Sequence, residues 1–143
     1  MTLAEVKDIV NADVFVGQDR LALEVATAFS ADLMSDVLSF ARPGCLLITG
    51  VTNAQSVRTA YALDIAAILI CRGKRPLQEA LDIAGELGIP ILATHYIMFE
   101  TCGRLFRHGM TGCIREVVQE QTPPTAPVKE AAESFSITGR NFS

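Results

Sequence analysis

The sequence lacks any hydrophobic stretch long enough to cross a membrane. Its longest apolar run, residues 65–71, is far shorter than the ~20 residues that a membrane-spanning helix needs. The first residues also lack the charged start and apolar run of a secretory signal. We therefore expect a cytoplasmic protein with no membrane partner, whose four cysteines are reduced thiols.

Positive charge and phosphate-binding motifs are also missing. The formal net charge is -4, and no basic arm or polybasic tail is present, which argues against a nucleic-acid partner. Residues 50–53 form a turn without the Gly-Lys-Ser/Thr ending of a Walker loop, and no Gly-x-Gly-x-x-Gly occurs. ATP hydrolysis and kinase chemistry therefore have no supporting motif.

Metal-binding and nucleophilic motifs are equally scarce. His95, Cys102, His108 and Cys113 could form a metal set, but structural zinc sites usually contain closer ligand pairs such as Cys-x-x-Cys. Cys102 also fits an apolar helix face, and His95 with Cys102 is a weaker alternative as a thiol–base pair. We predict no catalytic residue, no metal and no cofactor.

What is present indicates one domain followed by a short extension. The chain of 143 residues is long enough to bury a core without disulfides or metal. Residues 121–127 are rich in proline and threonine, which is typical of a linker. We therefore divide the chain into a domain over residues 1–119 and a Pro-rich linker with a C-terminal arm over residues 120–143.

Short apolar segments alternate with helical apolar stripes along most of the chain. Strands are predicted over residues 13–16, 23–29, 45–49, 65–71 and 89–93, and helices over residues 3–10, 33–41, 54–61, 77–87 and 98–106. Ser30 and Asp32 are candidate N-caps for the helix that follows them. The continuously apolar residues 65–71 suit a strand that is covered on both faces. The pattern predicts an α/β fold with a mostly parallel sheet, flanking helices and βα alternation.

Three loops are expected to meet at the carboxyl edge of this sheet, where ligands bind in open parallel sheets. Each loop precedes a helix N-terminus, whose free N–H groups favour anions, and one loop is basic. The alternative is a solvated basic turn beside ordinary helix caps. The anion-site hypothesis names these residues: Thr52, Asn53, Arg72, Gly73, Lys74, Arg75 and His95.

Residues 19–38, 62–73 and 88–92 resemble the DRTGG domain family, and the resemblance extends over residues 1–112. The motif that names the family departs here, because Ala26-Thr27-Ala28 replaces Thr-Gly-Gly. The resemblance implies a fold similar to the N-terminal domain of HPr kinase. Such domains also accompany phosphotransacetylases and regulated pyrophosphatases.

The resemblance implies a regulatory or assembly role, often with self-association, and no established catalytic residues. We therefore expect a non-catalytic domain that senses a nucleotide or another anionic ligand, or docks a protein partner, and forms a homodimer. The alternative is a small enzyme that acts on a phosphorylated metabolite at the basic loop.

Overall fold

The computed structural model describes residues 1–118, which form twelve elements. In chain order these are α1 (Leu3–Ile9), β1 (Asp13–Val16), η1 (Gln18–Arg20), β2 (Thr27–Ser30), α2 (Met34–Phe40), β3 (Leu46–Thr49), α3 (Ala54–Ala62), β4 (Ala67–Ile70), α4 (Gln78–Leu87), β5 (Ile91–Ala93), α5 (Met98–Arg107) and β6 (Thr111–Gly112). Strands and helices alternate from β2 onward, as the sequence predicts.

The six strands form one sheet in the order β1-β5-β4-β3-β2-β6. Strands β2 to β5 are mutually parallel, and β6 runs parallel to β2. Only β1, at the opposite edge, is antiparallel to its neighbour β5. The predicted α/β fold with a mostly parallel sheet is therefore confirmed.

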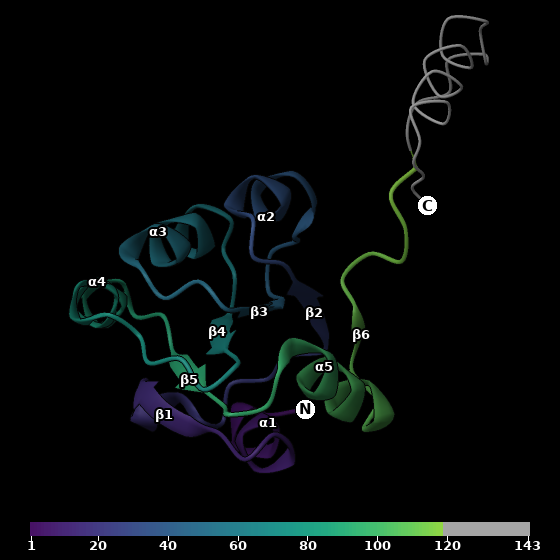
Figure 1. Cartoon of the computed structure of the whole chain (residues 1–143), viewed down its shortest axis with the longest axis horizontal. Helices are drawn as coiled ribbons and strands as arrows, with labels where there is room; N and C mark the ends of the chain where they lie inside the picture. The colour runs from purple at the N-terminus through teal and green to yellow at the C-terminus, as the bar shows by residue number, and fades with distance from the viewer. Residues whose placement is uncertain (119–143) are drawn as a thin grey trace, which may run out of the picture.

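Helices cover both faces of the sheet, which explains why its central strands are apolar throughout (Figure 1). Every residue of β3 and β4 is buried. Alternate side chains of these strands enter two separate cores, one beneath α2, α3 and α4 and the other beneath α1 and α5. One face thus carries three helices and the other carries two.

Local signals fix the ends of several helices. The Asn53 side chain caps α3 by accepting a hydrogen bond of 3.1 Å from the backbone N–H of Gln55. Gly88 ends α4 in the left-handed conformation, with φ of 74°. Thr2 and Glu5 form a reciprocal capping box at the start of α1. These short-range interactions set where the connecting loops begin.

Two sequence predictions about the region before α2 are wrong. The strand predicted over residues 23–29 starts only at Thr27, because the preceding residues turn toward the N-terminal segment, where Thr2 bridges Glu24 and Val25 donates to the carbonyl of Met1. Neither Ser30 nor Asp32 caps α2, whose N-cap is Leu33 without a side-chain hydrogen bond. The carboxylate of Asp32 is instead engaged by another loop, described below.

The predicted linker and arm over residues 120–143 lie outside the described residues, so the division of the chain into a domain and an arm stays a prediction. Within residues 1–118, no helix combines the length and apolarity needed to span a membrane.

Candidate functional site

The carboxyl ends of β2, β3, β4 and β5 meet at one edge of the sheet because these strands are parallel. After β4 the chain passes to α4 on one face, whereas after β5 it passes to α5 on the other face (Figure 1). The two connecting loops therefore diverge from neighbouring strands. Such a divergence is where ligands bind in open α/β sheets.

A cavity of about 160 Å³ lies between these loops. We call it the loop cavity; its lining includes Gly73, Lys74 and Arg75 from the loop after β4, and Thr94 and His95 from the loop after β5. This volume is smaller than the roughly 300–1,000 Å³ of typical small-molecule pockets. The loop cavity is therefore suited to one charged group of a ligand rather than to a whole nucleotide.

The loop cavity combines cationic side chains with close backbone. The guanidinium carbon of Arg75 lies 5.1 Å from the centroid of the Phe15 ring, a cation–π contact that orients this side chain. A Cβ atom added to Gly73 would lie 3.0 Å from Nδ1 of His95, so the imidazole packs directly against the glycine backbone. Asp13 adds one carboxylate to the lining and partly offsets the positive charge of Lys74 and Arg75.

Arg72 does not line the loop cavity and instead forms an ion pair with Asp32. Nη1 of Arg72 lies 3.1 Å from Oδ2 of Asp32. The other oxygen of Asp32 accepts hydrogen bonds from the backbone N–H of Gly50 at 2.7 Å and from the hydroxyl of Thr49 at 3.3 Å. These donors, led by the Gly50 N–H, lower the pKa of Asp32 below its usual value. An anion at Arg72 would have to compete with this carboxylate.

The backbone of Arg72 is held in an unfavourable conformation. Its φ is 71°, in the left-handed region that side chains other than glycine seldom adopt. The N–H of Arg72 donates to the carbonyl of Tyr96 at 2.8 Å, and the N–H of Gly73 donates to the carbonyl of Thr94 at 3.0 Å. The loop after β4 is thereby tied to the loop after β5. Such strain concentrates at functional positions.

Thr52 and Asn53 also lie outside the loop cavity. Asn53 caps α3, and the carbonyl of Thr52 accepts a hydrogen bond of 3.0 Å from the N–H of Leu77, just before α4. The structure thus gathers four of the seven predicted ligand residues, Gly73, Lys74, Arg75 and His95, around one cavity. The ligand-binding roles of all seven stay predictions.

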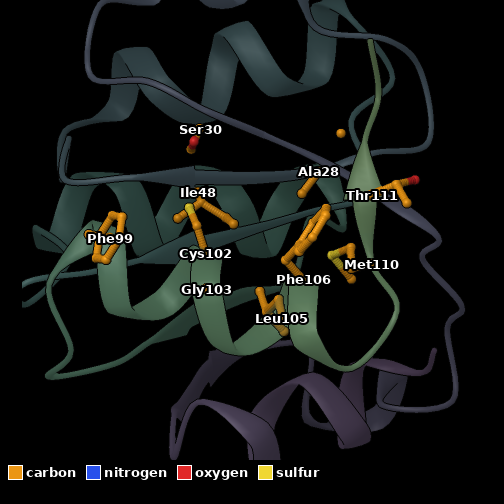
Figure 2. Close-up of a pocket in the computed structure, with 11 residues that line it drawn as sticks. Ala28, Ser30, Ile48, Phe99, Cys102, Gly103, Leu105, Phe106, Met110 and Thr111 are labelled. Atoms are coloured by element: carbon orange, nitrogen blue, oxygen red, sulfur yellow. The ribbon is translucent and has the colours of Figure 1, made fainter. Parts of the chain in front are cut away.

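The residues considered for metal or thiol chemistry are dispersed. His95 lines the loop cavity, whereas Cys102 lines an apolar groove between α5 and the strands β2 and β6, which we call the α5 groove (Figure 2). His108 follows the end of α5 and accompanies Glu5 and Asp8 in a third cavity. Sγ of Cys113 faces the carbonyl of Phe40. No cluster of three metal-ligating side chains occurs within residues 1–118.

Sequence reasoning missed three residues of this edge. The sequence pattern predicts Asp32 as a helix cap, but its partner Gly50 lies 18 positions away. Asp13 and Phe15 reach the loop cavity because β1 pairs antiparallel with β5, and Asp13 lies opposite Ala93. No short motif signals either arrangement, since both depend on pairing across distant segments.

The sequence profile of the DRTGG domain matches residues 5–107. The chain belongs to the DRTGG domain family. No curated protein matches the sequence.

One similar structure is the crystal structure of the CBS and DRTGG domains of the regulatory region of Clostridium perfringens pyrophosphatase, complexed with its activator diadenosine tetraphosphate. The TM-score is 0.63 at 16% sequence identity, and the alignment covers 93% of this chain. It covers 59% of the chain in that structure, so this chain spans less than two thirds of the solved regulatory region. The similarity shows that this chain shares its fold with part of that regulatory region.

Proposed function

We propose that this DRTGG domain is a regulatory module that binds a phosphorylated ligand through the loop cavity and self-associates. The observation that carries the proposal is the convergence of Lys74, Arg75 and His95 from two diverging loops on one cavity. A cationic and imidazole lining favours a phosphate group, which accepts hydrogen bonds and carries negative charge.

The ends of the neighbouring helices support the same ligand class. The N-caps of α4 and α5, Leu77 and Ile97, make no side-chain capping hydrogen bond. The first N–H groups of both helices therefore have no side-chain cap and contribute a positive potential beside the loops. The helix α3, by contrast, is capped by Asn53.

A nucleotide polyphosphate is the ligand class that we favour. The similar pyrophosphatase regulatory region is complexed with diadenosine tetraphosphate as its activator. A ligand of this kind could place one phosphate in the loop cavity and leave the rest of the molecule along the carboxyl edge. Binding would regulate a partner only to the extent that the ligand prefers one state of the domain over another.

Thermal unfolding with a panel of phosphorylated ligands tests this proposal. The panel contains AMP, ADP, ATP, diadenosine tetraphosphate, pyrophosphate and phosphate. A ligand at about 100 times its Kd should stabilise the fold by ~2.7 kcal/mol and raise Tm by several degrees. The double substitution of Lys74→Ala with His95→Ala should reduce the affinity at least ~10-fold in calorimetric titration.

Arg42→Ala provides the matched control, because Arg42 is an exposed cation between α2 and β3, at the opposite edge of the sheet. It should leave the ligand-induced shift unchanged. Absence of any shift at millimolar ligand, or an equal loss in the Arg42→Ala protein, would contradict the proposed ligand site.

A further inference from the structure

The α5 groove is an apolar hollow on the surface of the described residues. It has a volume of about 310 Å³ and is lined mainly by carbon atoms, with Ala28 of β2 on one side and Phe106 of α5 on the other (Figure 2). Phe99 and Phe106 are 83% and 70% exposed. The groove lies on the face of the sheet that carries two helices rather than three.

Helix α5 has two apolar sides, although a helix that packs on one core needs only one. Thr101 and Leu105 are buried against the sheet. Phe99, Gly103 and Phe106 follow at i, i+4 and i+7 and form a second side, about two fifths of a turn away. This second side is exposed along its whole length.

Within residues 1–118, no contact or backbone conformation requires a glycine at position 103. A glycine in the middle of a helix destabilises it by roughly 0.5–1 kcal/mol relative to alanine. A Cβ atom added at Gly103 would meet nothing within 4 Å, and the backbone there does not need the left-handed region. A glycine at the centre of an exposed apolar side permits another backbone to approach closely.

We propose that the α5 groove is a two-fold interface with a second copy of this chain, in which the two α5 helices cross antiparallel at Gly103. Antiparallel alignment about this residue brings Phe99 of each copy beside Phe106 of the other. The inference rests on the self-association in the proposed function and assigns it a surface.

Charge complementarity is the reason to choose a second copy as the occupant. In the same alignment Glu100 of each copy lies opposite Arg107 of the other, so two ion pairs flank the apolar contact. Within residues 1–118, Glu100 pairs with Arg104 at 2.7 Å and stays half-exposed, while Arg107 makes no ion pair. A surface whose charges and aromatic residues match their own two-fold images is what an isologous dimer requires.

The test measures the mass of the full chain by light scattering and its dimer dissociation constant by sedimentation. Wild type should be a dimer at micromolar concentration. Phe106→Asp should raise the dissociation constant at least ~30-fold, as expected for an aromatic residue at the centre of an interface. Leu38→Asp is the control, because Leu38 is 54% exposed on α2, on the opposite face, and should leave the dimer intact.

Exchange of the two charges tests whether the copies align as proposed, and not only whether the dimer needs apolar surface on α5. Glu100→Arg and Arg107→Glu should each weaken the dimer by bringing like charges together, and the double exchange should restore affinity to within ~3-fold of wild type. Circular dichroism of the monomeric variants verifies that the protein keeps its overall helical content.

Three results would overturn the interface. A monomeric wild type at ~100 μM rules out the second copy as occupant. If the Phe106→Asp protein stays dimeric, the chain self-associates through another surface. If the double charge exchange does not restore the affinity, the proposed antiparallel alignment of the two α5 helices is wrong. Ligand-induced thermal shifts, measured on the same Phe106→Asp protein, report on the loop cavity separately, so failure of the interface and failure of the ligand site are distinguishable.

Discussion

Asp32 shows how one side chain can join three segments of the sheet edge. Its two carboxylate oxygens accept hydrogen bonds from the loop after β3 and from Arg72 after β4, while Asp32 itself follows β2. The backbone N–H of Gly50 is the closest donor, at 2.7 Å. Removal of the carboxylate leaves that N–H without its partner.

Asp32→Ala should lower the free energy of unfolding by about 1–2 kcal/mol at pH 7, the cost of a donor that loses its acceptor. The pKa of Asp32 is lowered in the folded state, first by the Gly50 N–H. The ionised carboxylate therefore contributes its full stabilisation above the unfolded pKa of about 3.9, and this contribution disappears as the pH falls through the folded pKa.

Urea unfolding of wild type and Asp32→Ala at pH 7, 5 and 3 measures this effect. The difference between the two proteins should be constant from pH 7 to 5 and should narrow toward pH 3 and below. Asp19→Ala, which removes an exposed carboxylate of η1, is the control and should leave the free energy of unfolding at pH 7 within about 0.5 kcal/mol of wild type. A gap that widens on acidification would refute this role of Asp32.

At the scale of elements, substitutions of Asn53 distinguish a role in capping α3 from a role in binding the ligand. The sequence predicts Asn53 as a ligand residue, whereas the structure shows it as the N-cap of α3. Asn53→Ala should reduce the free energy of unfolding by ~1 kcal/mol because the helix loses its capping acceptor.

Asn53→Ser keeps a capping oxygen and should retain most of the stability, as measured by urea unfolding. Both variants should bind phosphorylated ligands with wild-type affinity if the loop cavity is the ligand site. A loss of affinity in both variants, with stability restored in Asn53→Ser, would return Asn53 to the ligand-binding residues.

The sequence predicts most elements of this fold because their signals are local. The buried strands β3 and β4 are continuous apolar runs, and α4 has a clear apolar stripe that ends at Gly88. The prediction does not include β6, because the two exposed residues Thr111 and Gly112 carry no strand pattern. They follow α5 in the chain and pair with β2.

The partners of each strand and the contacts between distant side chains are less predictable from the sequence than the helices and strands themselves. The side chains of residues 23–26 alternate between less and more exposed positions, but these residues contact the N-terminal segment and do not pair within the sheet. Arg72 is correctly placed in the basic loop, yet its partner Asp32 lies 40 positions away. The loop cavity itself depends on the antiparallel placement of β1, which the sequence pattern does not specify.

At the scale of the whole molecule, the two cores share the same strands and should open together. Cys45 is buried in the core beneath α2, α3 and α4, and Cys71 in the core beneath α1 and α5. Burial raises the pKa of the Cys45 thiol to about 11 and also raises the pKa of Cys71. Both thiols are therefore shielded and protonated at neutral pH.

Alkylation with iodoacetamide at pH 7.5, followed by peptide mass spectrometry, measures this shielding. In the native protein only the half-buried Cys102 and Cys113 should react within minutes. Cys45 and Cys71 should become reactive over the same range of urea concentration, because unfolding of either core exposes strands of the other. Modification of Cys71 well before Cys45 would show that the layer formed by α1 and α5 detaches independently.

The hydrogen bond from the N–H of Arg72 to the carbonyl of Tyr96 connects the basic loop of the proposed ligand site with the segment that leads into α5, the helix of the proposed dimer interface. Tyr96 lies just before α5, and its ring is 4.2 Å from the guanidinium carbon of Arg104 on that helix. These two contacts link the basic loop to the helix that carries Phe99 and Phe106. If occupancy of the loops changes the strength of dimer formation by some factor, thermodynamic reciprocity makes the dimer hold its effector more tightly or more weakly by the same factor.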